Sequence, residues 1–510
     1  MYPVYRIQLK LPITNLSFKE IYENQKIRLK GGTYMLYIDG IWKESESKAS
    51  FDVINPATGK VVATVAKGGR KEAQSAIDAA QNAFSLWAKL TAKERYIYLK
   101  KAADILRGRV DSLAELITKE MGKPVAEAKG EIGLAIDYLD WYAEEGKRIY
   151  GDTIPASSPT KRLMVVRQPV GVIGAITPWN FPIAMITRKL APALAAGCTV
   201  VLKPSEESPL SAMEVVKALH EAGIPNGVVN LVHGDAKEIG DTLMDSPVVK
   251  KITFTGSTAV GKELVRKSAE TMKKVSMELG GHAPFIVFED ADLDKAVEGA
   301  IASKFRNAGQ TCVCTNRIFV QKSISEEFAH RLKTQMEQLV VGNGLEEGVN
   351  IGPLINKRAI EKTESHVIDA VSKGAKVIYG GSKPEGEAFS KGNFFHPTVL
   401  LHATNDMKIA YEETFGPVAP IFEFETEEEV IEKANDTIYG LASYIFTQNG
   451  ARMFRVSEAL DYGIVGVNDA MPTVAQAPFG GVKESGIGRE GGKYGIEDYL
   501  ETKFVSFDFK

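Results

Sequence analysis

The sequence predicts an α/β protein built from two doubly wound, Rossmann-like domains, and two observations predict it. Short apolar segments of strand length alternate with helical segments between residues 171 and 254, and a second alternation starts near Phe285 and continues beyond Tyr439. Such alternation is typical of parallel βαβ units. Because no linker rich in glycine, serine or proline separates the two stretches, we expect the domains to share a tight interface with a cleft between them.

Three helices are expected before the first of these strands. The first has apolar residues spaced so that they share one helix face, namely Ala73, Ile77, Ala80, Phe84 and Trp87. The capping-box pattern at Thr91–Glu94 indicates the start of the second helix. The third runs through Leu113 and Ile117, and Gly122 and Pro124 are expected to stop it.

The later elements are predicted from apolar runs and from the glycines that end helices. The expected strands are Gly171–Thr177, Thr199–Leu202, Val228–Val232, Ile252–Phe254 and Phe285–Phe288. The expected helices between them are Ile183–Ala196 and Leu210–Ala222. The C-terminal stretch Tyr499–Phe509 alternates weakly, like an edge strand.

Composition narrows the possible functions. The chain of 510 residues has a formal net charge of −3, so it carries no strong positive field for nucleic acid. No apolar run reaches the ~18–20 residues that a membrane helix needs. Only three cysteines occur, Cys198, Cys312 and Cys314, which excludes a disulfide scaffold and fits a reducing, cytoplasmic compartment. The histidines show no metal-ligand spacing, so we expect no protein-bound metal.

Residues 1–34 show neither the apolar core of a signal peptide nor a persistent helical or strand period. We expect a loose N-terminal extension. A second hypothesis concerns translation: Lys30–Thr33 can be encoded by a purine-rich ribosome-binding sequence, which would place the true start at Met35. The mass of the protein made from its native locus distinguishes the two.

Two residues are candidates for covalent catalysis. Cys312 lies in the polar, glycine-containing segment 307–314 rather than in an apolar run, so it is a candidate nucleophile. A lone cysteine is also commonly a small core residue. Glu278 is flanked by apolar residues and glycines, and burial there would raise the pKa of its carboxyl group towards that of a general base. A salt-bridged structural glutamate is the alternative.

Three further segments fit a ligand site. The turn Thr255–Gly261 follows a strand and opens a helix, so it is either a phosphate cradle or a plain βα turn. Asn180 is a polar side chain held between two prolines and two aromatic residues. Lys203 ends an apolar strand, at the edge where open α/β sheets bind ligands.

Together these segments resemble the aldehyde dehydrogenase superfamily over residues 37–508. The motifs that carry the resemblance are TPWNFP (177–182), KPSE (203–206), FTGSTAVG (254–261), MELGG (277–281), GQTC (309–312), EETFGPV (412–418) and PFGGVKESGIGREGG (478–492). Within the superfamily the chain resembles the succinate-semialdehyde dehydrogenases most. That narrower resemblance is carried by AMITRKLAPALAAG, KFRNAGQTCVC, YGIVGVN and GREGGKYGIEDYLETK.

The resemblance implies a mechanism. The thiolate of Cys312 would attack the aldehyde to form a thiohemiacetal, with the side-chain amide of Asn180 and the backbone N–H of Cys312 as oxyanion donors. Hydride would then move to the nicotinamide and leave a thioester. Glu278 would activate the water that hydrolyses this thioester.

The resemblance also implies cofactor contacts. The positions concerned are Thr177, Pro178, Trp179, Lys203, Ser205, Glu206, Gly256, Ser257, Glu413 and Phe415. Among them Glu206 would accept hydrogen bonds from the adenosine ribose and repel a 2′-phosphate. We therefore expect NAD to be preferred, while Ser205 and Lys203 leave NADP possible.

Substrate contacts follow from the narrower resemblance. Arg188 and Arg306 match arginines that bind the carboxylate of succinic semialdehyde, and Thr473 matches a position that is usually serine. Arg188 lies just over two helical turns after Asn180, so both can face one cleft. Each arginine alone could equally form a structural salt bridge.

Cys314 has two interpretations. It is either a packing residue or the partner in a reversible disulfide that protects Cys312 from over-oxidation.

The implied organisation is a cofactor-binding domain at 35–155 and 170–280, a catalytic domain at 281–480, and oligomerisation strands at 156–169 and 481–510. We therefore expect a small-molecule aldehyde substrate and a homo-oligomer, either dimer or tetramer. The alternatives are a glutarate-semialdehyde or non-phosphorylating glyceraldehyde-3-phosphate dehydrogenase, an acyl-phosphate reductase, in which Glu278 would have no role, and a structural, crystallin-like protein.

Overall fold

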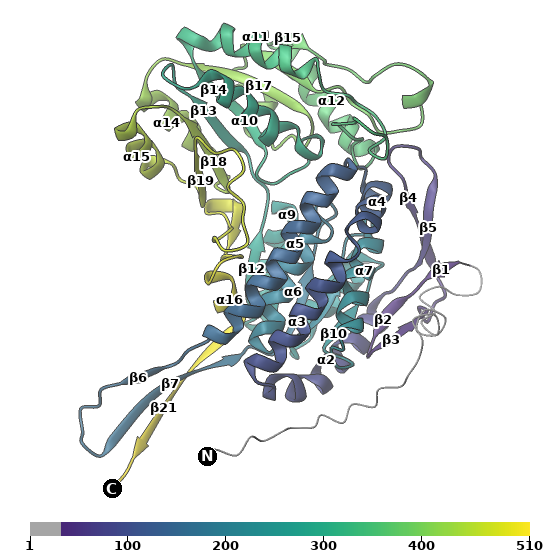
Figure 1. Ribbon diagram of the computed structural model, residues 1–510, viewed down its shortest axis with the longest axis vertical. Coiled ribbons are helices and arrows are strands. Elements are labelled where there is room, and N and C mark those ends of the chain that lie inside the picture. The colour runs from purple at the N-terminus through teal and green to yellow at the C-terminus, as the bar shows by residue number, and fades with distance from the viewer. Residues whose placement is uncertain (1–31) are drawn as a thin grey trace, which may run out of the picture.

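The computed structural model describes residues 32–510 as two α/β domains and a projecting three-stranded sheet (Figure 1). The two doubly wound domains expected from the sequence are confirmed. Residues 1–31 lie outside the described part, so the loose extension and the start at Met35 stay predictions. The end of the expected extension is ordered into a strand, because β1 (Thr33–Tyr34) pairs with β5 (Val61–Ala66), which also pairs with β4 (Ser50–Ile54). No helix within residues 32–510 combines the length and apolarity needed to cross a membrane.

The first domain contains an eight-stranded sheet in the order β20-β12-β11-β8-β9-β10-β2-β3, in which β12 to β10 run parallel. Its strands are β2 (Leu36–Ile38), β3 (Ile41–Lys43), β8 (Val172–Ile176), β9 (Thr199–Lys203), β10 (Val229–Leu231), β11 (Val249–Thr255), β12 (Lys274–Glu278) and β20 (Gly486–Ile487). The parallel part starts at β8, adds β9 and β10 on one side, and then adds β11 and β12 on the other. The carboxyl ends of β8 and β11 therefore flank a topological switch point, where open α/β sheets bind ligands.

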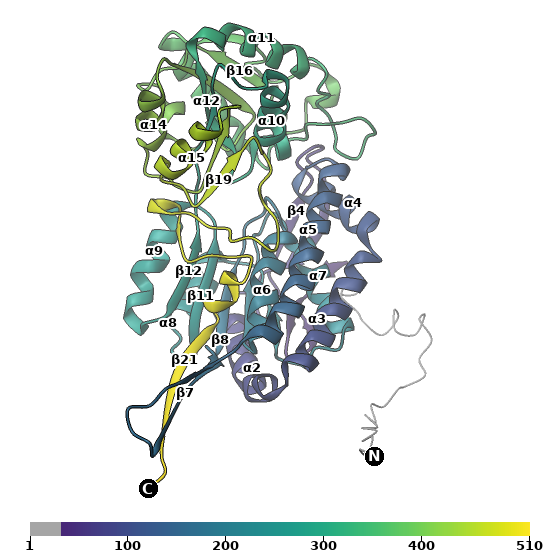
Figure 2. The ribbon, with the colours of Figure 1, turned by 60° about the vertical axis from the view of Figure 1, so that its left-hand side comes forward.

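Helices cover both faces of this sheet (Figure 2). They are α2 (Arg70–Lys89), α3 (Ala92–Arg107), α4 (Val110–Met121), α5 (Val125–Glu145), α6 (Ala184–Ala196), α7 (Pro209–Glu221), α8 (Ala236–Asp245) and α9 (Thr258–Ser268), with the short α16 (Tyr494–Glu497). Alternate residues of β9 enter different cores. Val200 and Leu202 pack with α3 to α7, whereas Val201 packs with α2, α8 and α9. A strand that is buried on both faces has a continuous apolar run in its sequence, which is why β9 could be predicted.

The second domain contains a seven-stranded sheet in the order β15-β16-β17-β14-β13-β18-β19, in which only β15 is antiparallel to its neighbour. Its strands are β13 (Ala283–Val287), β14 (Thr315–Gln321), β15 (Lys376–Tyr379), β16 (Thr398–Leu401), β17 (Val418–Phe424), β18 (Ala442–Phe446) and β19 (Ile464–Val467). Its helices are α10 (Leu293–Phe305), α11 (Ser325–Met336), α12 (Lys357–Ser372), α13 (Lys408–Tyr411), α14 (Glu427–Asn435) and α15 (Gly450–Ala459).

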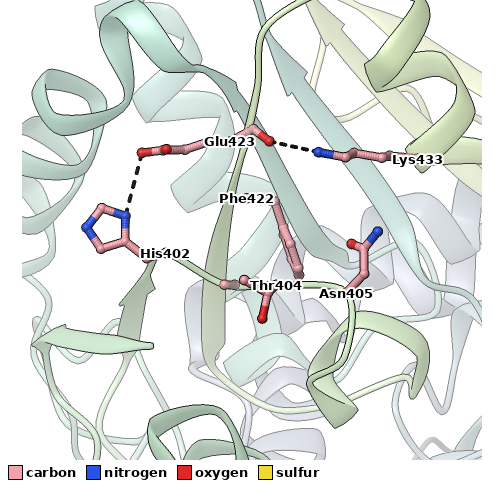
Figure 3. Close-up of a pocket in the computed structure, with 7 residues that line it drawn as sticks. His402, Thr404, Asn405, Phe422, Glu423 and Lys433 are labelled. Carbon is pink, nitrogen blue, oxygen red and sulfur yellow. Dashed lines mark hydrogen bonds and ion pairs between the residues drawn. The ribbon is translucent and has the colours of Figure 1, made fainter. Parts of the chain in front are cut away.

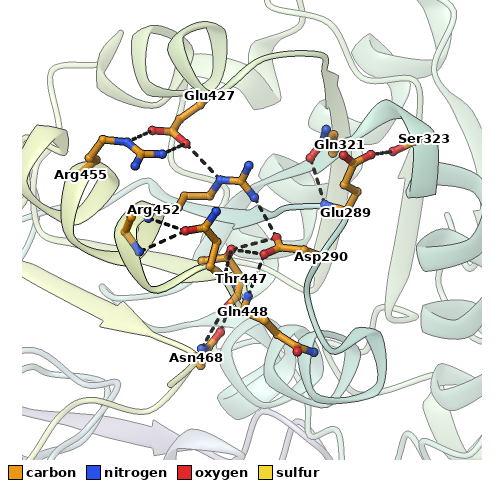
Figure 4. Close-up of polar contacts among 12 residues, drawn as sticks. Glu289, Asp290, Gln321, Ser323, Glu427, Thr447, Gln448, Arg452, Arg455 and Asn468 are labelled. Atoms are coloured by element: carbon orange, nitrogen blue, oxygen red, sulfur yellow. Dashed lines mark hydrogen bonds and ion pairs between the residues drawn. The ribbon is translucent and has the colours of Figure 1, made fainter.

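Hydrogen bonds and ion pairs connect α14 and α15 to each other and to the loop after β13 (Figure 4). Asp290 follows β13 and accepts hydrogen bonds from Thr447 Oγ1 and Arg452 Nη1, both at 2.8 Å. Glu427 of α14 binds both Arg452 and Arg455 of α15, at 3.0 and 2.9 Å. The network is bidentate and shared among several charges, which is the arrangement in which surface ion pairs contribute measurably to stability.

The predicted helices are confirmed with small changes at their ends. Of the five residues expected on the buried face of α2, Ala73, Ile77, Ala80 and Trp87 are fully buried and Phe84 is half-buried. Thr91 and Glu94 form the reciprocal capping box at the start of α3. At the end of α4, Gly122 adopts a left-handed φ of 94°, which a residue with a side chain rarely adopts.

The 21-residue helix α5 was not predicted from the sequence. Pro124 was expected only to stop the preceding helix, but it is also the N-cap residue of α5. Proline is well tolerated at the beginning of a helix, because the first N–H groups have no partner inside the helix. The omission matters because α5 carries Glu131, a residue that supports the candidate site described below.

A sheet of three antiparallel strands projects from the first domain, in the order β21-β7-β6 (Figures 1 and 2). β21 (Leu500–Asp508) pairs with β7 (Lys161–Pro169) along its whole length, and β6 (Asp152–Ile154) pairs with the other edge of β7. The expected strand segment 481–510 is too long, because only its last part joins this sheet. Residues 486–487 form β20, which pairs with β12 in the first domain and brings residues 488–490 beneath its carboxyl edge.

Candidate active site

Four residues predicted from the sequence lie along the carboxyl edge of the first sheet. Glu278 ends β12, Gly256 follows β11, Thr177 follows β8 and Lys203 ends β9. The strands are neighbours in this order, so the four residues form a row across the switch point. The hydroxyl oxygen of Thr177 is buried there and has no hydrogen-bond partner among the described residues.

Asn180 is buried and held by several contacts. Its side-chain amide donates to the backbone oxygen of Gln310 at 3.1 Å. Its own backbone oxygen accepts hydrogen bonds from Lys123 Nζ at 2.8 Å and from Asn307 Nδ2 at 3.1 Å. Lys123 forms a buried ion pair with Glu131 at 2.6 Å, and Glu131 also accepts from the first N–H groups of α6. The side-chain amide has two N–H donors, so one hydrogen remains for another acceptor.

Cys312, the expected nucleophile, is half-buried on the loop that follows α10. Residues 307–309 precede it in a left-handed turn with φ values of 52°, 53° and 76°. Such a conformation is costly for the two residues that are not glycine, and it persists only where surrounding contacts hold it. One such contact is the carboxylate of Glu127, which accepts from Asn307 N at 2.7 Å. Gly281 packs against the Cys312 carbonyl so closely that a Cβ atom would lie 2.1 Å from its oxygen.

Charged groups converge on the Cys312 thiol. Burial raises the pKa of this thiol to about 12, Arg188 is the largest opposing influence, and Glu278 and Glu413 raise the pKa further, while Arg306 lowers it. The structure therefore brings the two expected carboxylate-binding arginines and the expected base close enough to act on the nucleophile's charge. At this pKa little thiolate exists near neutral pH in the protein alone, so the attack requires removal of the thiol proton.

Glu278 has the environment expected of a base. Its side chain is 2% exposed, and neither carboxylate oxygen has a hydrogen-bond partner among the described residues. It is therefore not the salt-bridged structural glutamate of the alternative interpretation. Burial raises the pKa of this carboxyl group well above its usual value, and Glu490 raises it further, against the influence of Arg188 and Lys189.

Lys203 and Glu206 contact each other at the switch point. Lys203 Nζ donates to Glu206 Oε1 at 2.6 Å, and the Glu206 side chain is 39% exposed whereas that of Lys203 is 6% exposed. Ser205, between them in sequence, accepts from Glu207 N at 3.2 Å. A paired ammonium and carboxylate presents one donor and one acceptor, which matches the two hydroxyls of a ribose.

The nearby turn at the start of α9 is also formed as expected. Ser257 is the N-cap residue and accepts from Val260 N at 3.4 Å. Gly256 packs against the ring of Phe254, where a Cβ atom would lie 2.3 Å from the ring.

Two contacts lie where the domains meet beside this row, and the one between Phe415 and Trp179 joins them. Glu413 precedes β17 and accepts from Gly281 N at 2.9 Å, and burial raises the pKa of its carboxyl group to about 7. Phe415 lies edge-on to Trp179, with ring centroids 5.7 Å apart and planes at 82°. Phe415 has a φ of 55°, a rare conformation for a bulky residue. Pro178 lies next to Trp179 in the loop after β8.

The two arginines differ in their contacts. Arg188 is buried on α6, forms an ion pair with Glu490 at 2.5 Å and stacks over the Phe479 ring at 4.1 Å. Arg306 is half-buried at the end of α10, 5.4 Å from the Phe181 ring centroid, and its buried Nε has no hydrogen-bond partner among the described residues. It lines a pocket of about 320 Å³ together with Glu127. Arg188 therefore forms the structural salt bridge that was the alternative interpretation, although it also lies near Cys312. Arg306 forms no such salt bridge among the described residues.

Cys314 is fully buried and points to a lysine. Lys304 Nζ lies 3.4 Å from its sulfur and donates to Asn316 Oδ1 at 2.8 Å. Burial raises the pKa of the Cys314 thiol, against the influence of Lys304. Both Cys312 and Cys314 are free thiols, so the disulfide between them stays a prediction.

Thr473, the third expected substrate position, is half-buried in the segment that follows β19. A separate pocket of about 340 Å³ lies on the second domain and is lined by His402, Thr404, Glu423 and Lys433 among others (Figure 3). Its lining includes none of the candidate site residues predicted from the sequence, so this pocket is separate from the site around Cys312.

Several residues of this site were not predicted from the sequence. Glu131 and Lys123 position Asn180, Glu127 holds the left-handed turn, and Glu490 pairs with Arg188. Glu490 lies inside the motif at 478–492, so a signal was present for it. The three others come from the segment of Pro124 and α5, for which no motif was recognised.

Comparisons with known proteins show the family of this chain. A model of the "Aldehyde dehydrogenase family" matches residues 42–505. The chain is 55% identical to a glutarate-semialdehyde dehydrogenase of Pseudomonas putida and 53% identical to an NADP(+) succinate-semialdehyde dehydrogenase of Escherichia coli, in each case over 92% of this chain and 96% of the relative. A crystal structure of succinate-semialdehyde dehydrogenase from Burkholderia pseudomallei superposes with a TM-score of 0.91 at 51% identity, covering 93% of this chain and 98% of that one. The chain belongs to the aldehyde dehydrogenase family.

Proposed function

We propose that this protein oxidises succinic semialdehyde to succinate with a nicotinamide dinucleotide as hydride acceptor. The observation that carries the proposal is a pair of arginines near the nucleophile. Arg188 lies over the Phe479 ring, and Arg306 lies beside Phe181 with a buried Nε that has no hydrogen-bond partner among the described residues. Both arginines lower the pKa of the Cys312 thiol. A substrate that carries a carboxylate a few carbons from its aldehyde would neutralise them while its carbonyl lies at the sulfur. Relatives that are named for succinate semialdehyde support the same substrate.

In the proposed mechanism Cys312 is the nucleophile. Its sulfur attacks the carbonyl carbon, and the developing oxyanion accepts hydrogen bonds from the free N–H of the Asn180 amide and from the backbone N–H of Cys312. Removing one such donor typically costs about 10²–10³ in rate. Glu278 takes a proton from the water that cleaves the thioester, and its raised pKa makes it a strong enough base for this step.

The residues present fit a dinucleotide. The unpartnered hydroxyl of Thr177, the Lys203–Glu206 pair and the turn at Gly256–Ser257 lie along one switch point, and Glu413 and Phe415 lie near Cys312 and Trp179. The bound cofactor supplies the hydride acceptor. We propose that Lys203 and Glu206 hold the adenosine ribose, that the start of α9 faces the pyrophosphate, and that Glu413 holds the nicotinamide ribose.

We propose NAD as the preferred cofactor. The exposed carboxylate of Glu206 would repel a 2′-phosphate. It also forms an ion pair with Lys203, so the ammonium group that could bind such a phosphate is already paired. The Escherichia coli relative is named for NADP(+), so the preference has to be measured.

Glutarate semialdehyde is the second candidate substrate, because a relative at 55% identity is named for it. It is one methylene longer than succinic semialdehyde. The methyl group of Thr473, at a position where the resemblance leads us to expect serine, would shorten the pocket and favour the shorter substrate.

A substrate panel tests the proposal. Each charge-assisted hydrogen bond contributes about 1.5–3 kcal/mol, so the wild-type enzyme should favour succinic semialdehyde over butanal by ~10²-fold or more in kcat/KM. Arg188→Ala and Arg306→Ala should each raise the KM for succinic semialdehyde more than that for butanal. The exposed-surface variant Arg331→Ala is the control. Similar kcat/KM values for succinic semialdehyde and butanal in the wild type would show that the arginines do not select a carboxylate. A higher kcat/KM for glutarate semialdehyde would make that compound the substrate instead.

We also propose that the projecting sheet mediates homo-oligomerisation. Within residues 32–510, one edge of its strand β21 is unpaired, and β21 exposes Phe504 and Phe507. An exposed edge with apolar side chains pairs readily with another chain. The choice between dimer and tetramer, and the cytoplasmic location expected from cysteine usage, stay predictions.

A further inference from the structure

A compact cluster of buried charges surrounds Arg188. The carboxylate of Glu490 lies between two cations, with Oε2 at 2.5 Å from Arg188 Nε and Oε1 in contact with Lys189 Nζ. All three side chains are at most 3% exposed. The two cations are consecutive residues of α6, whereas Glu490 comes from the C-terminal segment that β20 brings under the sheet.

The charges of this cluster do not cancel. Within the cluster of Arg188, Lys189 and Glu490, one carboxylate faces two cationic side chains. Burial raises the pKa of the neighbouring Glu278 carboxyl group well above its usual value, which disfavours a second anion there. The cluster therefore carries one surplus positive charge in a buried place. A buried surplus charge is unfavourable until an opposite charge arrives, so this cluster favours an anionic ligand over a neutral one.

Arg188 is the cation of this cluster that remains available to a ligand. Lys189 Nζ is occupied by Glu490, whereas Arg188 Nη2 contacts the sulfur of Met185 at 3.0 Å. The hydroxyl of Tyr138 also lies beside the Arg188 guanidinium, but neither of these neutral groups balances its charge. A thioether is a weak acceptor that a carboxylate readily displaces. The ring of Phe479 covers one face of the guanidinium, so the guanidinium has a fixed plane and offers its edge to a ligand.

We propose that Glu490 and Lys189 form a charge-compensated support for Arg188: Glu490 orients the guanidinium, and Lys189 neutralises Glu490, so that Arg188 keeps a full positive charge for the carboxylate of the substrate. Lys189 is then a positioning residue that determines specificity without touching the substrate. The inference rests on the proposed function, since it explains how Arg188 binds a carboxylate although it is already paired with one.

Variants that remove a charge test whether Lys189 and Glu490 support Arg188 in this way. Lys189→Met keeps the shape of the side chain and removes its charge, which leaves Arg188 and Glu490 to cancel each other. The ratio of kcat/KM for succinic semialdehyde to kcat/KM for butanal should fall about tenfold or more. The ratio removes any loss of active enzyme that is common to both substrates.

The double variant Lys189→Met/Glu490→Gln separates charge from structure. It removes both members of the compensating pair, so Arg188 again carries the surplus charge and the ratio should return to within about threefold of the wild type. A purely structural role predicts that the second substitution adds damage without restoring the ratio. If Lys189→Met alone is insoluble, the double variant is compared with the wild type directly, and a ratio reduced by about tenfold overturns the inference.

The outcomes for the two proposals are distinct. A wild-type enzyme without preference for succinic semialdehyde over butanal overturns both the proposed function and this inference. A wild-type preference that survives Lys189→Met overturns only the role of Lys189. A ratio that falls in Lys189→Met and recovers in the double variant supports the charge-compensated support.

Discussion

Lys203 Nζ and Glu206 Oε1 are 2.6 Å apart at the carboxyl end of β9, in an ion pair whose lysine is buried and whose glutamate faces solvent. The pair places a negative charge at the outer end of the switch point. A ribose diol can share both partners, whereas a phosphate on that ribose meets the carboxylate first.

The first prediction therefore concerns cofactor preference. Glu206→Gln should raise kcat/KM with NADP relative to NAD by about tenfold or more, because it removes the repulsion and releases Lys203 to bind a phosphate. Steady-state assays with both cofactors measure the ratio. Glu207→Gln, at the exposed neighbouring position, is the matched control. If NADP is already the better cofactor in the wild type, the role proposed for Glu206 is wrong.

The second prediction separates acylation from deacylation. Cys312→Ala should abolish both NADH formation and covalent labelling by the aldehyde. Glu278→Gln should leave a single-turnover burst of NADH and slow the steady state, because only hydrolysis of the thioester needs the base. Stopped-flow absorbance shows both phases. Cys198→Ala is the control, because it removes another buried thiol, one that donates to the backbone oxygen of Tyr499. Normal steady-state turnover of Glu278→Gln would remove Glu278 from the mechanism.

The third prediction is a pH dependence. Burial raises the pKa values of both the Cys312 thiol and the Glu278 carboxyl group. Each group works in its deprotonated form, and a raised pKa leaves that form scarce at low pH. Turnover should therefore rise with pH across the neutral and mildly alkaline range, by up to about tenfold per pH unit while one ionisation limits the rate. A kcat profile that is flat or falls with rising pH over this range contradicts the assignment.

The same profile distinguishes the two groups. In Glu278→Gln the burst of NADH still requires the Cys312 thiolate, so the burst rate should keep its rise with pH. The residual steady-state rate should lose the part of the pH dependence that belongs to the carboxyl group.

The fourth prediction concerns assembly. Deleting residues 500–510 removes β21 and leaves the long edge of β7 unpaired, so the protein should dissociate or unfold. Phe504→Glu is the milder test, because Phe504 is 59% exposed and its replacement leaves the pairing of β21 with β7 intact. Analytical ultracentrifugation should show a smaller species for Phe504→Glu, with thermal unfolding as the check on folding. An unchanged sedimentation profile for both variants argues against an interface at this sheet.

The fifth prediction concerns oxidation. If Cys314 protects the nucleophile, peptide mapping after mild peroxide treatment should find a Cys312–Cys314 disulfide that a thiol reductant removes. Cys314 must leave Lys304 to reach Cys312, so Lys304→Met should change the rate of disulfide formation. Sulfonic acid at Cys312 without the link would leave Cys314 as a packing residue.

The sequence alone determined four central strands of the first sheet, β8 to β11, and its motifs mark the residues that we propose for the chemistry. The strand at Thr199–Leu202 and the helix at Ala73–Trp87 were predictable because each is encoded by a local period or an apolar run. Cys312 and Glu278 were predictable because short motifs surround them, and short motifs are local.

Only the tertiary structure decided how these residues are supported. Lys189 and Glu490 are 301 positions apart, and Asn180 and Gln310 are 130 positions apart. Nothing in a local pattern states which buried carboxylate will meet which cation, because that pairing depends on how β20 and α6 pack after the whole sheet has formed. The helix α5 was missed because Pro124 carries the same signal for the end of one helix and the start of another. The motifs around the proposed reactive groups are thus local in the chain. The charge cluster around Arg188 arises from tertiary pairing, and the raised pKa of Glu278 arises from burial, so both exist only in the folded protein.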